Sequence, residues 1–361
     1  MGKRWFALAV VYACSAVLAF EIAGRVTYFS HHDLPLLSPA SDLVYRFYPD
    51  LQDAVRDDPQ GALRVLILGG STLNRGFCDA ESRLQEQLAS WLGRDVRIVN
   101  LAVAAQGSLD SYYKYWYLRD RHFDLVVLYN GINELRANDV PGELRRDDYS
   151  HYAWYEEVNF LVRHYDLTRY GLVLPFYLQH QAVSLDRKII SRGRKVPYNS
   201  AGIRPEWMPF GASIKSAVPF RRNLERTLSL ARAKREPVLL MTFAYAIPEE
   251  YSRVRFEQGA LGYDRSKPGE PVEMWGRPED IIRGLQVHND IIREAANGTD
   301  VFFVDQDALM KHDPRNFIDV CHLSPAGSDQ FVRHMVDKLK RQRFTMPRRS
   351  ASSLGWPSDA S

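Results

Sequence analysis

The sequence lacks the features that mark several large protein classes. It has only 3 cysteines, too few for a disulfide framework and without the spacing of a metal site. Its 47 basic and 44 acidic residues leave a formal net charge of +3, which gives no reason to expect nucleic-acid binding. No internal repeat is visible. With 45% hydrophobic and 25% charged residues, the 361-residue chain is expected to be a globular protein with an ordinary core.

The few cysteines still allow one bridge, between Cys78 and Cys321, in an oxidising compartment. Two buried free thiols are the simpler interpretation, and it is the one we adopt. A nucleophilic role for Cys321 would compete with a better placed serine, which is described below.

The one long apolar segment lies at the N-terminus. Lys3 and Arg4 precede an uncharged run from Trp5 to Phe20, the pattern of a secretion signal or membrane anchor. We expect an uncleaved, single-pass signal anchor; the alternatives are secretion after cleavage behind Ala19 and lipid attachment at Cys14. All three place the rest of the chain on the periplasmic, extracytoplasmic side of the inner (cytoplasmic) membrane, because the basic residues stay in the cytoplasm.

The sequence divides into four parts. After the signal anchor or transmembrane segment, 1–25, comes a proline-containing segment, 26–62, which is expected to be a stalk or a strap over the domain surface. Residues 63–342 are expected to form the folded domain, and 343–361 a disordered tail. The domain contains a long insertion, 136–216, without a strand pattern, and such insertions are usually functional.

The insertion is dense in aromatic residues, for which core packing is a simpler interpretation than a sugar-binding platform. We expect it to contribute helices that cap or flank the site. A basic group late in the insertion is interpreted as a solvated loop, with contact to an anionic lipid or polymer as the alternative. Its members are Arg187, Lys188, Arg192, Arg194 and Lys195.

From Arg64 onward, short apolar runs alternate with longer amphipathic stretches, which predicts parallel strands covered by helices. The expected strands are Val65 to Leu68, Val96 to Asn100, Leu125 to Tyr129, Val238 to Phe243 and Val301 to Val304. The expected helices lie near Glu81 to Leu92, Ser111 to Arg121, Arg221 to Lys234, Pro278 to Ala296 and Pro325 to Arg341. This order predicts a three-layer α/β/α fold with a five-stranded, parallel, doubly wound sheet of the flavodoxin-like kind.

Two distant segments carry the residue types of a serine hydrolase. The first expected strand runs into Gly69, Gly70 and Ser71, so a sharp turn can present the serine hydroxyl at the end of the strand. Asp319 precedes His322 by three residues, in a short loop before the last helix. A serine hydroxyl needs a base to take its proton, and the base works best when a carboxylate orients it. These segments can therefore supply a nucleophile, a base and an orienting acid.

Two further loops follow expected strands and offer hydrogen-bond donors: Ala104 to Ser108 and Asn130 to Glu134. The glycine turn before Ser71 has neither the lysine of a phosphate-binding loop nor the spacing of a dinucleotide fingerprint. In this chain order the four segments resemble the blocks of the SGNH (GDSL-type) hydrolase superfamily, which contribute serine, glycine, asparagine and histidine. The resemblance covers about Arg64 to Arg341.

The resemblance implies a role for each matching residue. Ser71 is implied as the nucleophile and, through its own amide, as the first donor of an oxyanion hole. The Gly107 amide and the Asn133 side chain are implied as the second and third donors. His322 is implied as the base and Asp319 as the acid that orients it.

Two positions depart from the family's pattern. Gly70 stands where the best-known motif has aspartate, and we expect altered hydrogen bonding around the turn. Glu134 stands where the third block often has aspartate, and we expect a change in how Asn133 is held. Neither position carries a catalytic role, so the departures bear on rate rather than on reaction type.

The leading interpretation is a membrane-anchored, extracytoplasmic serine esterase that forms an acyl-enzyme. An O-acetyl group on a cell-envelope glycan is the substrate that location and family precedent favour. Interception of the acyl-enzyme by a sugar hydroxyl would make the protein an O-acyltransferase instead. A non-catalytic binding or assembly protein is the third possibility.

The expected partners are an acylated small molecule or glycan and, through the N-terminal helix, the membrane. No cofactor and no metal are expected, because the acidic pair Asp305 and Asp307 has no further ligands at suitable spacing. The remaining histidines, His312 among them, are expected to be surface or packing residues.

Overall fold

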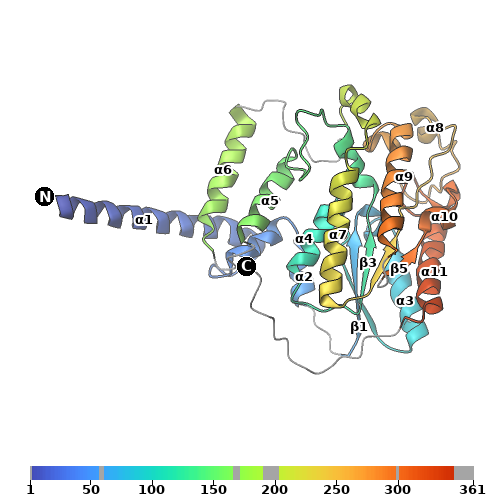
Figure 1. Cartoon of the computed structure of the whole chain (residues 1–361), viewed down its shortest axis with the longest axis horizontal. Coiled ribbons are helices and arrows are strands. Elements are labelled where there is room, and N and C mark those ends of the chain that lie inside the picture. Colours follow the sequence, from blue (N-terminus) through green and yellow to red (C-terminus); the bar gives the residue numbers. More distant parts are fainter. Residues whose placement is uncertain (1, 57–60, 166–170, 190–202, 298–300, 345–361) are drawn as a thin grey trace.

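The computed structural model describes residues 2–56, 61–165, 171–189, 203–297 and 301–344 (Figure 1). Its centre is one parallel sheet with the strand order β2-β1-β3-β4-β5. The strands are β1 (Leu63–Gly69), β2 (Val96–Asn100), β3 (Leu125–Tyr129), β4 (Val238–Met241) and β5 (Val301–Val304). This order confirms the predicted doubly wound, flavodoxin-like sheet. Every residue of β1, β3 and β4 is buried, which explains why these strands read as continuous apolar runs.

Helices cover both faces of the sheet, in the three layers expected (Figure 1). The α-helices of the sheet layers are α3 (Ala80–Leu92), α4 (Ser108–Tyr117), α7 (Ala217–Lys234), α9 (Pro278–Ala295) and α11 (Pro325–Arg341). Alternate residues of β1 face opposite sides: Leu66 and Leu68 join the core under α4 and α7, whereas Val65 and Ile67 join the core under α3 and α11. Shorter helices are α2 (Asp50–Arg56), α8 (Arg253–Gln258) and α10 (Gln306–Met310). The 3-10 helices are η1 (Ser30–His32), η2 (Ala40–Arg46), η3 (Ser71–Leu73), η4 (Ile132–Asn138), η5 (Pro205–Ala212), η6 (Val272–Met274) and η7 (Pro314–Asn316).

Several element boundaries differ from the prediction, among them the start of α7 at Ala217 rather than Arg221 and the end of α4 at Tyr117 rather than Arg121. Two of the differences have local reasons. Helix α4 begins at Ser108 rather than Ser111, because the carboxylate of Asp110 accepts the amide proton of Gly107 and so caps the first turn. Strand β4 ends at Met241 rather than Phe243, because the Phe243 amide donates to the Asn289 side chain and leaves the sheet ladder.

The N-terminal helix α1 (Gly2–Phe29) extends beyond the expected boundary at residue 25. Within its span from Lys3 to Phe29, an 18-residue window has a mean hydropathy of 2.1, so the helix is long and apolar enough to cross a membrane or to act as a signal sequence. The following segment does not extend away as a stalk. Residues 26–29 belong to α1, and Leu43, Tyr48 and Leu51 are buried in the core beside α4, so residues 30–56 lie against the domain as a strap.

The insertion 136–216 contributes α5 (Ala153–Tyr165) and α6 (Leu174–Ile189) together with η5. Its aromatic residues Tyr149, Tyr152 and Tyr155 are buried in the core, as the packing interpretation requires. Of the basic group, Arg192, Arg194 and Lys195 lie outside the described residues. Of the expected tail, 345–361 lies outside them as well, whereas Phe344 packs against Phe302 and belongs to the domain.

Candidate active site

Ser71 follows β1 at the carboxyl end of the sheet, where β1 separates β2 from β3. Sheets of this kind bind ligands at such a point. Glycine at position 70 lets the Asn133 amide approach the turn closely, because a Cβ atom there would lie 2.7 Å from Nδ2 of Asn133 and 3.1 Å from the carbonyl oxygen of Gln106. A larger residue at this position would have to displace the Asn133 amide.

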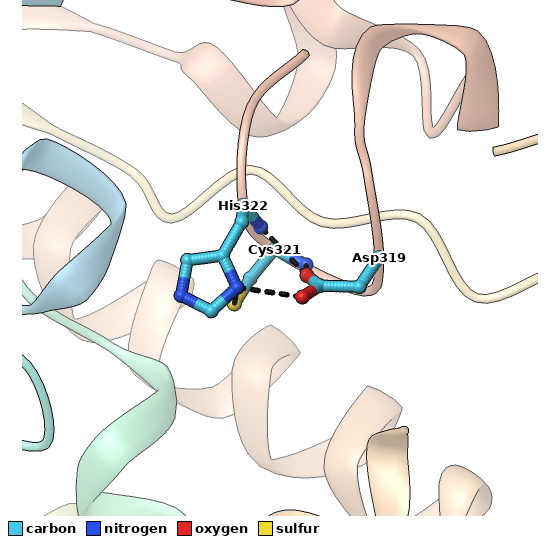
Figure 2. A group of neighbouring side chains, drawn as sticks. All are labelled: Asp319, Cys321 and His322. Carbon is cyan, nitrogen blue, oxygen red and sulfur yellow. Dashed lines mark hydrogen bonds and ion pairs between the residues drawn. The ribbon is translucent and has the colours of Figure 1, made fainter. Parts of the chain in front are cut away.

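The serine, the histidine and the aspartate lie in one hydrogen-bonded chain. Oγ of Ser71 is 2.8 Å from Nε2 of His322, and Nδ1 of His322 is 2.6 Å from Oδ2 of Asp319. Ser71 is 6% exposed, His322 2% and Asp319 0%, so water has little access to the proton path. Figure 2 shows that Asp319 and His322 come from the same short loop before α11.

The carboxylate of Asp319 is held by backbone amides as well as by the imidazole. Oδ1 accepts from the amides of Cys321 at 2.9 Å and His322 at 2.8 Å, and Oδ2 accepts from the Glu270 amide at 2.8 Å. Burial favours the protonated acid, but His322 and these amides outweigh burial and hold the pKa of Asp319 below its usual value. The Glu270 amide approaches because residue 269 is glycine: a Cβ there would lie 2.8 Å from Cβ of Asp319.

The environment of His322 sets its protonation. Burial favours the neutral ring, whereas the neighbouring Cys321 and Asp319 favour the charged one, and together they raise the pKa of His322. Burial also raises the pKa of the Cys321 thiol, which is therefore neutral near pH 7, so the Asp319 carboxylate is the charge that acts on the ring. Phe77 stacks on the imidazole with ring centroids 4.6 Å apart and fixes its plane.

Cys78 and Cys321 are both free and buried, as the simpler interpretation of the cysteines predicted. The Cys78 thiol donates to the carbonyl oxygen of Thr72 at 2.9 Å, and burial raises its pKa to about 11. Asp319, Cys321 and His322 bring possible metal ligands within 4.8 Å of one another (Figure 2). A metal would have to replace the Nδ1 proton shared with Asp319 and ionise a thiol whose pKa burial raises. The arrangement therefore suits proton transfer better than metal binding.

The side chain of Asn133 is fixed by two hydrogen bonds. Its Nδ2 donates to the carbonyl oxygen of Gln106 at 2.9 Å, and its Oδ1 accepts from Nε1 of Trp275 at 3.1 Å. The Trp275 bond orients the amide so that Nδ2 lies beside the serine turn. Oε1 of Glu134 accepts from the amide of Ser108, at the start of α4, whereas the two bonds that hold the Asn133 side chain come from Gln106 and Trp275.

Gly107 lies in the loop beside Ser71, but its amide already has an acceptor. The N–H donates to Oδ2 of Asp110 at 2.9 Å. Asp110 is fully buried and also accepts from the hydroxyls of Tyr48, at 2.8 Å, and Tyr155. Burial raises the pKa of Asp110 above its usual value. The structure therefore brings Asn133 to the serine turn and commits the Gly107 amide to Asp110.

Glu134 forms a second acidic group behind the same loop. Burial raises its pKa to about 7, although the Ser108 amide and hydroxyl favour its ionised form. Its Oε2 is buried and has no hydrogen-bond partner among the described residues. A Cβ on residue 107 would lie 2.8 Å from Oε1, so the close contact between Glu134 and the loop requires Gly107.

His288 supports the site without facing Ser71. It lies fully buried on α9, with Nδ1 3.0 Å from the carbonyl oxygen of Gly131 and Nε2 2.9 Å from Oγ of Ser216. Burial lowers its pKa to about 4, so the neutral ring donates through Nδ1 and accepts from the serine. It therefore anchors the loop that carries Asn133. His312, by contrast, is exposed, as predicted.

The acidic pair after β5 has a structural role. Oδ2 of Asp305 accepts from Nε of Arg293 at 3.0 Å, and Oδ2 of Asp307 accepts from an Nη atom of the same residue at 2.8 Å. The side chain of Asp305 also accepts from the Ala308 amide and caps α10. These contacts explain the two carboxylates without a metal ligand role.

A cavity of about 520 Å³ lies at the far end of α4 from Ser71. It is lined by the strap, the C-terminal turn of α4 and α5, including Tyr45, Trp116 and Leu161. Helix α4 has 10 residues and so separates this cavity from the serine turn by about 15 Å. The cavity is therefore not part of the site around Ser71.

No protein-family model matches this sequence, and no curated protein matches it. Similar solved structures include an acetyl xylan esterase from Geobacillus stearothermophilus, with 12% identity, 76% of this chain and 94% of that chain covered, and a TM-score of 0.42. A GDSL-like lipase from Bacteroides thetaiotaomicron has 13% identity, coverage of 82% and 98%, and a TM-score of 0.40. A lipase/acylhydrolase from Enterococcus faecalis has 14% identity, coverage of 80% and 99%, and a TM-score of 0.38. At these values the similarity assigns no residue, so each role proposed for this chain comes from its own geometry.

Proposed function

We propose that this protein is a serine esterase of the SGNH type. The observation that carries the proposal is the buried chain from Ser71 through His322 to Asp319, with contacts of 2.8 and 2.6 Å at the carboxyl end of β1. A buried serine, imidazole and carboxylate in this order transfer a proton along a defined path. A binding scaffold has no physical need for all three.

In the proposed reaction, Oγ of Ser71 attacks the ester carbonyl carbon while Nε2 of His322 takes the hydroxyl proton. The imidazolium is stabilised by the Asp319 carboxylate, and it gives the proton to the departing alkoxide as the C–O bond breaks. Water then attacks the acyl-enzyme, His322 takes a proton from it, and the proton returns to Ser71 as the acid leaves. Only the neutral form of His322 can begin this cycle.

The oxyanion that forms on the carbonyl oxygen needs donors fixed before the reaction. We assign this role to the Ser71 amide and to Nδ2 of Asn133, whose orientation is set by Trp275. The Gly107 amide is the third candidate. It would join the hole only by exchanging its acceptor Asp110 for the oxyanion.

We further propose that α1 anchors the protein in the inner membrane with its domain on the periplasmic side. The support is the basic start followed by an apolar helix that is almost wholly exposed. An O-acetyl group on a cell-envelope glycan is the proposed substrate, because a domain in this location meets such esters.

A serine-directed fluorophosphonate tests the catalytic part on the full-length protein. We expect labelling of the native protein, none of Ser71→Ala, and normal labelling of a control, Ser82→Ala, whose hydroxyl is exposed on α3. An unlabelled native protein, or equal labelling of Ser71→Ala, would overturn the proposal. Hydrolysis of acetylated glycans with and without added sugar acceptors then separates an esterase from an O-acyltransferase.

A further inference from the structure

Helix α6 has an apolar face that no described part of the chain covers. Leu178 and Leu185 are each 57% exposed, and Ala182 between them is exposed as well. Positions 178, 182 and 185 follow the spacing that places side chains on one side of a helix. The opposite side is buried, with Phe176 against Phe47 and Val183 in the interior.

The position of α6 is fixed by the last turns of α1. The carboxylate of Glu21 accepts from the amides of Val173 and Leu174, at 3.0 and 2.9 Å, and so caps the start of α6. Glu21 is itself bonded to Arg25, whose guanidinium donates to backbone carbonyls of the strap. The polar contacts of Glu21 thus join α1 to the start of α6 near residue 21 of α1.

Aromatic packing strengthens the joint between the helices. The ring of Tyr28, near the end of α1, meets Phe176 at 5.5 Å and His180 at 6.1 Å. Gly24 lets the helices approach closely, because a Cβ there would lie 3.3 Å from Cγ1 of Val173. Helix α6 therefore has a defined direction relative to α1.

Figure 1 shows that direction: α1 projects away from the sheet, α6 runs across the end of α1, and α5 lies on the side of α6 toward the sheet. The α5 and α6 helices pack together, so the exposed face of α6 is turned away from the domain. A bilayer around α1 would have its surface along this face. The exposed apolar residues of α1 reach this level, with Phe20 and Ile22 next to the Glu21 joint and Val26 about one turn beyond it.

We propose that α6 is an interfacial helix that lies on the membrane surface, with Leu178, Ala182 and Leu185 in contact with lipid. This inference rests on the proposed membrane anchor α1. An apolar face on a helix parallel to the bilayer typically sinks about 5–10 Å into the boundary between headgroups and acyl chains. Two attachments, α1 across the bilayer and α6 along it, would hold the domain in one orientation relative to the membrane.

Depth-dependent fluorescence quenching tests the proposal with the full-length protein in phosphatidylcholine and phosphatidylglycerol vesicles. Cys14 is exposed and Cys78 and Cys321 are buried, so Cys14→Ser supplies an unlabelled background. An environment-sensitive fluorophore is attached after Leu178→Cys or Leu185→Cys in that background, and to Cys14 in the native chain. The matched controls are Val218→Cys and Val254→Cys, at exposed apolar positions on α7 and α8.

We expect lipids with a nitroxide near the headgroup to quench the labels at positions 178 and 185, and lipids with a deep nitroxide to quench the label on Cys14. The labels at 218 and 254 should lose no emission. Quenching at Cys14 without quenching at 178 and 185 would overturn the inference and leave the anchor in place. No quenching at Cys14 would overturn the anchor and the inference with it. Equal quenching at all positions would also overturn it, because it would indicate adsorption without a preferred face.

Discussion

Replacing Asp319 by asparagine should remove most of the activity, because the structure gives an amide no satisfactory orientation. Each oxygen of Asp319 faces two donors: Oδ1 accepts from the amides of Cys321 and His322, and Oδ2 accepts from the Glu270 amide and the imidazole. An asparagine NH2 group at the Oδ1 position would meet two backbone N–H groups. At the Oδ2 position it would face the Glu270 amide and donate to Nδ1 of His322.

The second orientation places the imidazole proton on the wrong nitrogen. Nδ1 would accept from the new NH2 group, so the neutral ring would carry its proton on Nε2, which must be free to take the proton of Ser71. In serine proteases the corresponding change lowers turnover about 10⁴-fold, and we expect a loss of about 10³- to 10⁴-fold here. The first orientation avoids this tautomer but leaves buried donors unpaired, at a cost of about 1–3 kcal/mol for each.

The assay is kcat/KM for a chromogenic acetyl ester, measured on Asp319→Asn together with its unfolding free energy. Asp313→Asn is the matched control, since Asp313 lies in the preceding turn, where its carboxylate binds Arg315. We expect the control to retain the native activity. A folded Asp319→Asn protein with more than about a tenth of native activity would refute the reasoning from the two donors on each oxygen.

Three further predictions concern the groups around this pair. Asn133→Ala should lower turnover by about 100- to 1,000-fold with little change in Tm, since it removes one oxyanion donor; native turnover would contradict the assignment. The acid limb of kcat/KM for the native protein should lie above pH 6.5, because His322 must be neutral to act as the base and Asp319 raises its pKa. An acid limb below pH 6.5 would show that Asp319 does not outweigh the effect of burial on this pKa. Burial raises the pKa of Glu134 to about 7, so the folded state keeps a proton that the unfolded state loses above about pH 4.5, and stability falls as pH rises between these values. Glu134→Gln should remove up to about 3 kcal/mol of this pH dependence, which urea unfolding at pH 5 and pH 8 measures.

The sheet could be predicted from the sequence because its strands are buried on both faces and read as apolar runs between amphipathic helices. The start of α4 could not, because it depends on a capping contact between Gly107 and Asp110 rather than on apolar spacing. For a similar reason, the sequence does not distinguish a stalk from a strap in the segment after the N-terminal helix. Its burial depends on partners such as α4, which lies far away in sequence.

The site shows the same division between local and tertiary information. The positions of Ser71, Asp319 and His322 follow from motifs at the ends of predicted elements, and the structure brings them into hydrogen-bonding distance. The groups that orient them were missed. Trp275 donates to Asn133, and Phe77 stacks on the imidazole, yet neither residue lies in a motif. The sequence shows only that residue 269 is a glycine. The contact that this glycine allows, between the Glu270 amide and Asp319, forms only in the folded chain.

The Gly107 loop links these missed contacts to function. A motif can predict that a backbone N–H points toward a serine turn, but it does not say which acceptor holds that N–H before substrate arrives. Here the acceptor is Asp110, and its other partners are Tyr48 from the strap and Tyr155 from the insertion. An oxyanion would compete with this carboxylate for the same proton. Because the pKa of Asp110 is raised by burial, its protonation would weaken it as an acceptor and favour release of the amide. The strap and the insertion, which lie outside the four motif segments, therefore hold the carboxylate that would compete for the third proposed oxyanion donor.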